Sequence, residues 1–382
     1  MAIKMPIILG IFNQKGGVGK SLVTSIVAEY AAIKADMNVL VVDLDMQCNS
    51  SDYWVGMENS PQSTGGQLPP IHPDYIEGDE DFADVEARST IADTFYGKEV
   101  LAYETYINPA NGFKGKVDCL LGHPALLEKI NTEFSNESGQ IEEKVINRLK
   151  EVLFNEFVGG EYDLVVLDTG PSRNPIFRSA IRCATHACIP FEPEEKSMQG
   201  INAMVQVIQS ENFSRNSTQQ LKLIGLIPNK VRINTNLHKG TLDMLQERLG
   251  SIMLPDDMFL PHSTAFPERD LKGINPRSIF QISKHHTALK HSETLCNYIL
   301  NDMFGKSVIR RKSKNRAGTG SIEKDNSTTA NTEKWAGAIA SQMLNKDKVK
   351  EVIVKTIPID FIKADQDNPR KLAIDLALIK KI

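Results

Sequence analysis

Several features that define other protein classes are missing from this chain of 382 residues. No continuous apolar run reaches the roughly 18 residues that a membrane-spanning helix needs. The chain leads at once into an apolar run at residues 5–12, so we expect no signal peptide. The five cysteines form no C-x-x-C pair. We therefore expect buried, reduced thiols and a cytoplasmic protein.

The net charge of −4 is small but unevenly distributed. Residues 1–305 contain 27 Lys and Arg against 39 Asp and Glu, whereas residues 306–382 contain 17 against 9. An acidic body followed by a basic tail indicates that the two parts have separate tasks.

The most informative segment that is present reads N-Q-K-G-G-V-G-K-S, at residues 13–21, directly after the first apolar run. A glycine-rich loop between a strand and a helix binds phosphate, because glycine lets backbone N–H groups approach the oxygens closely. Lys20 is expected to reach the β- and γ-phosphates, and the Ser21 hydroxyl to bind Mg²⁺. The usual pattern has glycine where this chain has Gln14, and Lys15 is an additional lysine. The residues of this loop expected to contact the nucleotide are Gly16, Gly17, Val18, Gly19, Lys20, Ser21 and Leu22.

Apolar periodicity predicts alternating strands and helices, hence an α/β fold with a mostly parallel, twisted sheet and helices on both faces. Strands are expected at 5–12, 38–42, 117–121, 164–167, 187–191, 221–227 and 252–254, and helices directly after residue 21, at 141–157 and at 284–304. Residues 56–90 are rich in proline, glycine and carboxylates, which indicates a mobile acidic insertion. A specific partner site in this segment is the alternative.

Two carboxylate motifs follow predicted strands. Asp168 ends the run L-V-V-L-D and suits the Walker B role of holding Mg²⁺. Asp43 and Asp45 are two residues apart, so along an extended chain their side chains point the same way. One of them can orient the metal shell while the other positions the attacking water. Acidic residues that merely end strands are the simpler alternative for either motif alone.

The additional Lys15 resembles the extra lysine of the deviant Walker A ATPases, the ParA/MinD group. In that family this lysine reaches the nucleotide of the other subunit, so the resemblance implies an ATP-sandwich homodimer. The sequence D-L-D-M-Q, which begins at Asp43, resembles the family's D-L-D-P-Q. It implies that Asp43 supports the Mg²⁺ shell and that Asp45 is the hydrolytic aspartate, acting with Lys15 and Lys20. The sequence P-N-K around Asn229 implies a contact with adenine.

The resemblance covers residues 6–304, so we expect one ATPase domain at 1–304. It implies ATP and Mg²⁺ as cofactors, weak intrinsic hydrolysis and a nucleoid-associated dimer. That dimer would bind DNA without sequence preference and be released by a ParB-type centromere-binding protein. Candidate DNA contacts are Lys230, Arg232, Lys239, Arg269, Lys272, Arg277 and Lys284.

The tail is expected to comprise a basic, polar linker at 305–348 and, at 349–382, a fragment that resembles the start of ParB-family proteins. The resemblance rests on I-P-I-D around Pro358 and N-P-R-K around Pro369. The basic run at 306–316 resembles the peptide with which ParB proteins stimulate their ATPase. It is equally well explained as a linker that binds DNA phosphates.

Three other functions were weighed. A nitrogenase-reductase type would need paired cysteines, which the spacings do not offer. A MinD-like membrane ATPase would end in an amphipathic helix, for which Leu372, Leu376 and Ile379 beside lysines could serve. A non-hydrolysing, nucleotide-gated adaptor or regulator belongs to a different class. We favour an ATPase that segregates a plasmid, chromosome or integrative element, without membrane contact.

Overall fold

The computed structural model describes residues 5–60, 66–79, 83–134, 139–194, 196–255, 258–271, 277–282 and 286–305, together with the backbone of two short strands near the C-terminus. The chain divides into two units, residues 1–325 and 326–382. In the second unit, β10 (Ile362–Ala364) pairs antiparallel with β11 (Leu372–Ile374). The expected linker, from residue 306 onward, lies outside the described residues. The ParB-like fragment is described only at these two strands.

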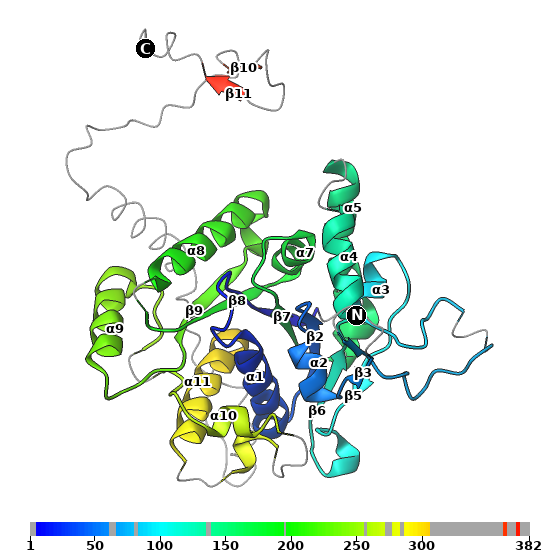
Figure 1. Cartoon of the computed structure of the whole chain (residues 1–382), viewed down its shortest axis with the longest axis horizontal. Helices are drawn as coiled ribbons and strands as arrows, with labels where there is room; N and C mark the ends of the chain where they lie inside the picture. Colours follow the sequence, from blue (N-terminus) through cyan, green and yellow to red (C-terminus); the bar gives the residue numbers. More distant parts are fainter. Residues whose placement is uncertain are drawn as a thin grey trace, which may run out of the picture. The chain divides into compact units, whose positions relative to one another are not determined.

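A seven-stranded sheet forms the centre of the first unit, in the order β5-β6-β2-β7-β1-β8-β9 (Figure 1). Its strands are β1 (Ile7–Ile11), β2 (Asn38–Leu44), β5 (Tyr103–Glu104), β6 (Lys116–Leu120), β7 (Leu164–Thr169), β8 (His186–Phe191) and β9 (Lys222–Pro228). Neighbouring strands are parallel, except that the short edge strand β5 runs antiparallel to β6. The predicted α/β fold with a mostly parallel sheet is confirmed.

Helices cover both faces of this sheet. Helices α1 and α11 lie on one face, and α5 and α7 lie on the other (Figure 1). The helices are α1 (Lys20–Ala35), α2 (Asn49–Trp54), α3 (Ile91–Phe95), α4 (Pro124–Phe134), α5 (Gly139–Leu153), α6 (Glu156–Glu161), α7 (Pro175–Cys183), α8 (Ser197–Ser214), α9 (Asn236–Leu249), α10 (Ala265–Glu268) and α11 (Thr287–Phe304).

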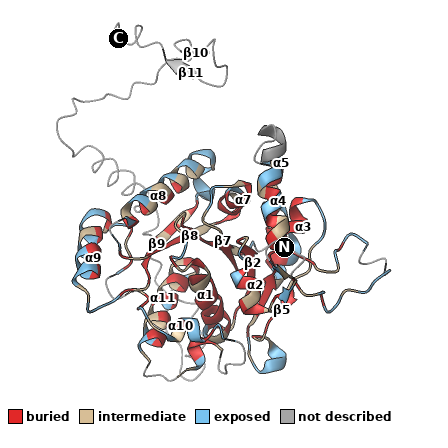
Figure 2. Ribbon diagram, viewed as in Figure 1, coloured by how far each residue is buried: buried red, intermediate tan, exposed pale blue. Residues whose placement is uncertain are grey.

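The central strands are buried over nearly their whole length, and Figure 2 shows the sheet as the most continuously buried part of the fold. Every residue of β7, including Asp168, is buried. This follows from its place between β1 and β2, where helices cover it on both sides and apolar residues are favoured throughout. A carboxylate at the end of such a strand lies in a protected environment.

Two predicted elements differ from the structure. The helix expected at 141–157 ends at Leu153, because Asn155 starts a second helix, α6, by accepting a hydrogen bond from the backbone N–H of Val158. The strand expected at 252–254 is not part of the sheet ladder. Only Met253 forms an isolated parallel bridge, to Leu226 in β9.

The acidic insertion at 56–90 is anchored to the body over part of its length. It contains a two-stranded hairpin, β3 (Glu58–Asn59) with β4 (Gln67–Leu68). His72 is only 4% exposed, and its ring packs against Tyr103 of the edge strand with 4.4 Å between the ring centroids. The segment is therefore attached to the sheet edge through β5, and its mobility stays a prediction.

Candidate active site

The phosphate loop connects β1 to α1, as the sequence predicts. Gly17 and Gly19 have φ angles of 74° and 89°, a backbone region that side chains disfavour. A Cβ added at Gly16 or Gly17 would meet no atom within 4 Å, so this side of the loop faces open space. The loop therefore offers an open cradle at the N-terminus of a 16-residue helix, where an anion is favoured.

Asn229 contacts this loop from the end of β9. Its Nδ2 donates a hydrogen bond of 2.7 Å to the carbonyl oxygen of Val18, and its Oδ1 accepts one from the N–H of Lys230. A Cβ at Gly19 would lie 2.0 Å from the same Nδ2. In this structure Asn229 fixes the shape of the loop, and the expected contact with adenine stays a prediction.

The two lysines of the loop have different surroundings. Lys20 is 6% exposed, and burial lowers the pKa of its ammonium group against the opposing effect of Asp168 and Asp45. The Nζ of Lys15 instead pairs with Glu194, and this contact lowers the pKa of Glu194. Lys20 therefore belongs to the interior of the site, whereas Lys15 lies at its surface.

The carboxylates expected at strand ends are close together. Asp43 pairs in register with Asp168 across β2 and β7, and both side chains are fully buried. Burial raises the pKa of Asp168 to about 6, with a smaller contribution from the charge of Asp45, and burial together with the charge of Asp168 raises the pKa of Asp43 to about 8. Asp45 follows β2 and is 7% exposed. A group of buried carboxylates is an environment that favours a bound cation.

Asp168 has one oxygen engaged and one available. Its Oδ2 accepts a hydrogen bond of 2.7 Å from Ser50, while its buried Oδ1 has no hydrogen-bond partner. The Ser21 hydroxyl is close enough to lower the pKa of this carboxyl group. A buried carboxylate oxygen next to a hydroxyl fits Mg²⁺, which binds through one or two protein groups, waters and substrate phosphates.

Asp43 is engaged on both oxygens. Oδ2 accepts hydrogen bonds from the N–H and the hydroxyl of Ser51, and Oδ1 accepts one from the N–H of Asp45. This arrangement fits indirect support of a metal shell rather than direct ligation. In the described part of the chain, no group of three His, Cys, Asp or Glu side chains could hold a metal ion alone.

The structure thus brings the residues singled out in the sequence to one place, at the carboxyl ends of β1, β2, β7 and β9. Sequence reasoning missed Ser50, Ser51 and Glu194. The serines follow the Asp45 motif directly, and their position after it was the available signal. Glu194 carries no local pattern that indicates its contact with Lys15.

One of the expected DNA contacts is corrected. Arg269 is only 5% exposed, and its guanidinium donates to the buried carboxylate of Glu29 at 3.2 Å. Arg277 is half-buried, with its guanidinium over the ring of Tyr53, 4.9 Å from the centroid, and its contact with DNA stays a prediction. Arg232 and Lys239 are exposed. Lys272 and Lys284 lie outside the described residues.

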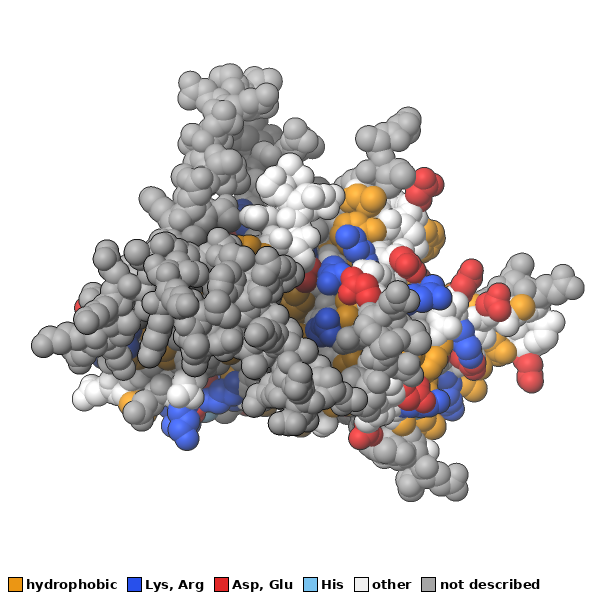
Figure 3. Space-filling view, turned by 90° about the horizontal axis from the view of Figure 1, so that it is seen from above, with side chains coloured by type: hydrophobic (Ala, Val, Ile, Leu, Met, Phe, Trp, Pro, Cys, Tyr) orange, Lys and Arg blue, Asp and Glu red, His pale blue; other side chains and the backbone are white. Residues whose placement is uncertain are grey.

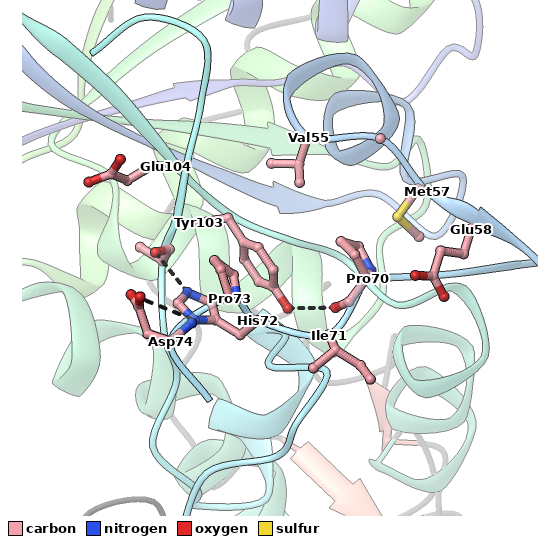
Figure 4. Close-up of a pocket in the computed structure, with 12 residues that line it drawn as sticks. Val55, Met57, Glu58, Pro70, Ile71, His72, Pro73, Asp74, Tyr103 and Glu104 are labelled. Atoms are coloured by element: carbon pink, nitrogen blue, oxygen red, sulfur yellow. Dashed lines mark hydrogen bonds and ion pairs between the residues drawn. The ribbon is translucent and has the colours of Figure 1, made fainter. Parts of the chain in front are cut away.

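A pocket of about 670 Å³ lies at the insertion, away from the phosphate loop (Figure 4). Several of its polar groups already have partners: the Tyr103 hydroxyl donates to the carbonyl oxygen of Pro70, the His72 ring contacts the Ala102 carbonyl and Asp74, and Glu58 pairs with Arg88. Such a lining does not present convergent polar groups to a ligand. In Figure 3, described acidic and basic side chains are interspersed rather than gathered by sign.

Among the described helices, none is long and apolar enough to cross a membrane.

Comparisons with known proteins identify the family of the chain. A family model described as "AAA domain" matches residues 6–223. A ParA family protein of Mycoplasma genitalium is 25% identical over 63% of this chain and 77% of its own length. The chromosome-partitioning ATPase Soj of Thermus thermophilus is 25% identical over 57% of this chain and 67% of its own length.

Two solved structures share the fold. A putative plasmid partition protein from Borrelia burgdorferi bound to AMPPNP has a TM-score of 0.54 at 18% identity, with 78% of this chain and 99% of that chain covered. A cobyrinic acid a,c-diamide synthase from Mycobacterium smegmatis with bound ADP and magnesium has a TM-score of 0.54 at 17% identity, with 79% and 97% covered. These likenesses show the fold alone, which holds AMPPNP in the first of those proteins and ADP with magnesium in the second.

Proposed function

The chain is a ParA-type member of the AAA domain family, and on this basis we propose that it is a partition ATPase that couples ATP hydrolysis to DNA segregation. The observation that carries the proposal is the convergence of the phosphate loop with Asp45 and Asp168. A buried lysine, a hydroxyl and an available carboxylate oxygen occupy the carboxyl ends of adjacent parallel strands, where α/β proteins bind nucleotides.

Each residue has a distinct part in this proposal. The loop N–H groups and Lys20 hold the phosphates, and Ser21 and Asp168 hold the metal shell, with Asp43 supporting it. Bound Mg²⁺ neutralises charge that develops on the phosphate oxygens. Asp45, next to this centre, orients the attacking water. Asn229 keeps the loop in shape by its bond to Val18.

Lys15 is proposed to act across a homodimer interface. Within one subunit its Nζ pairs with Glu194, and both side chains are more than a third exposed. An exposed ion pair contributes about 0–1 kcal/mol, so little opposes the transfer of Lys15 to the nucleotide of a second subunit.

The proposed cycle follows from these parts. ATP closes the dimer, and the dimer binds DNA without sequence preference. A ParB-type centromere-binding protein stimulates hydrolysis and releases it, in the cytoplasm and at the nucleoid. Support comes from the relatives named for partition and from the exposed Arg232 and Lys239.

ATP turnover by the full chain tests the proposal. With Mg²⁺ we expect slow turnover that Lys20→Ala reduces at least about 100-fold, since this residue stabilises the transferring phosphoryl group. Lys34→Ala, at the other end of α1, is the matched control, because Lys34 only pairs with Glu293 at the surface. Mg²⁺-dependent ATP binding without turnover would instead favour the nucleotide-gated adaptor.

A further inference from the structure

The short helix α2 connects the two buried carboxylates of the site. The Ser50 hydroxyl donates to Oδ2 of Asp168 at 2.7 Å. The next residue, Ser51, donates its N–H and its hydroxyl to Oδ2 of Asp43, both at 2.7 Å. Ser50 is 1% exposed and Ser51 is 0% exposed, so water does not compete for these bonds.

Ser51 also ties the helix to a third strand. Its Oγ accepts a hydrogen bond of 2.8 Å from the N–H of Gly122, just beyond β6. One hydroxyl therefore joins the ends of β2 and β6 to α2. Because the hydroxyl both donates and accepts, its rotation is fixed, and with it the oxygen of Asp43 that it contacts.

The other end of α2 is bonded to α1, the helix that follows the phosphate loop. The Tyr53 hydroxyl donates to Glu29, a residue of α1 that is 0% exposed. Glu29 also accepts a hydrogen bond of 2.7 Å from Ser278 and pairs with Arg269 at 3.2 Å. The Tyr106 hydroxyl is a fourth donor, at 3.5 Å. A buried carboxylate with four donors is held firmly in place, because an unpaired buried charge would be costly.

We propose that Ser50 and Ser51 are positioning residues for Asp168 and Asp43, and that Glu29, through Tyr53, fixes the helix that carries them. Ser50 holds Oδ2 of Asp168 and thereby leaves Oδ1 as the oxygen available to the metal shell. This inference rests on the proposed ATPase function. It adds residues to that function that act only through the carboxylates.

The test measures Mg²⁺-dependent binding of a fluorescent ADP analogue to the full chain, apart from turnover. Ser50→Ala is expected to raise the Mg²⁺ concentration for half-maximal binding by at least about tenfold, as loss of a partner behind a metal ligand does. Binding of the analogue in EDTA should stay unchanged. Ser292→Ala is the matched control, because Ser292 is equally buried but its hydroxyl has no hydrogen-bond partner.

Tyr53→Phe tests the far end of the same helix. It removes the hydroxyl that donates to Glu29 and that also lies 3.3 Å from the Tyr106 hydroxyl, and this hydroxyl bonds to neither Asp43 nor Asp168. We expect a smaller rise in the same Mg²⁺ concentration, about threefold, with kcat lowered and KM for ATP nearly unchanged. A lower thermal midpoint with wild-type Mg²⁺ dependence would show a purely structural role and overturn this part.

The outcomes separate the inference from the function. If Ser50→Ala and wild type require the same Mg²⁺ while wild type hydrolyses ATP, the positioning role is wrong and the ATPase function stands. If wild type itself binds nucleotide without any effect of Mg²⁺, both the positioning role and the proposed ATPase function are wrong.

Discussion

At the scale of single residues, burial separates groups that look alike in the sequence. Lys20 is enclosed by carboxylates, whereas Lys15 reaches outward to Glu194. Asp43 has both oxygens engaged, whereas Asp168 keeps one without a partner. The same residue types therefore serve different purposes within one loop and one pair of strands.

The buried carboxylates predict how stability depends on pH in the absence of ligands. Burial raises the pKa of Asp168 to about 6 and that of Asp43 to about 8, above the value of about 4 in an unfolded chain. The folded state then binds protons more tightly. The contribution of the two protonated carboxyl groups to the stability of the fold is therefore fully present below about pH 4. It is lost as the pH rises through about 6 to 8.

Asp168→Asn removes the ionising group at similar size. Without ligand, we expect the free energy of unfolding of the variant at pH 8 to be higher than that of wild type by on the order of 1–3 kcal/mol. This difference should disappear as the pH falls toward 4.5. Urea unfolding at several pH values measures it, with Asp243→Asn, an exposed position on α9, as control. A difference between Asp168→Asn and wild type that does not vary with pH would contradict this explanation.

The position of these carboxylates could be predicted from sequence, because each directly follows an apolar strand and parallel strands end at one edge. The side chains that bond to the site residues could not be predicted from sequence. The hydrogen bond from Ser50 to Asp168 joins residues 118 positions apart in the sequence, and the one from Asn229 to Val18 joins residues 211 positions apart. No local periodicity encodes contacts of that separation, which depend on how the strands are ordered in the sheet.

At the scale of elements, the β1–loop–α1 unit is shaped by a contact from β9. Gly19 has a positive φ and lies against Asn229, so two independent constraints exclude a side chain there. Six strands of the sheet and the first and last helices were predicted correctly, since their apolar runs are long and regular. The strand expected at 252–254 forms only an isolated bridge, and the short edge strand β5 was not predicted. The break before α6 was missed because Asn155 lies within an apparently continuous helical pattern.

Gly19→Ala is expected to disturb both the fold and the site. Alanine at this φ costs about 1–3 kcal/mol, and its Cβ would displace Asn229 from Val18. We expect a lower thermal midpoint and nucleotide affinity reduced at least about tenfold, a loss of about 1.4 kcal/mol. Gly240→Ala in α9, where a Cβ meets nothing within 4 Å, should not lower the midpoint. Wild-type behaviour of Gly19→Ala would refute the assigned constraint.

At the scale of the whole molecule, the acidic body and the basic tail differ by twenty charges, −12 against +8. The net charge of the tail is positive, so DNA or an acidic surface would attract it. All of the proposed site residues lie in the body. Regulation and chemistry are therefore proposed to lie in different parts of one chain.

Deleting residues 306–382 tests the activating role of the tail. If the basic run stimulates the ATPase, DNA-stimulated turnover should fall several-fold while turnover without DNA stays near that of the full chain. Replacing the six Lys and Arg of 306–316 by Gln should have the same effect. If DNA-stimulated turnover is unchanged and DNA binding is weaker, the activating role is wrong and the basic run is a linker that binds DNA.

The central claim is that ATP closes a dimer in which Lys15 reaches the other subunit. Light scattering of Asp45→Ala, which should bind ATP without hydrolysing it, tests this most directly. With ATP and Mg²⁺ we predict a mass of twice the 42.5 kDa chain, and with ADP the monomer mass. Adding Lys15→Ala should return the ATP sample to the monomer mass while nucleotide remains bound. A monomer with ATP, or a dimer that persists without Lys15, would contradict the account.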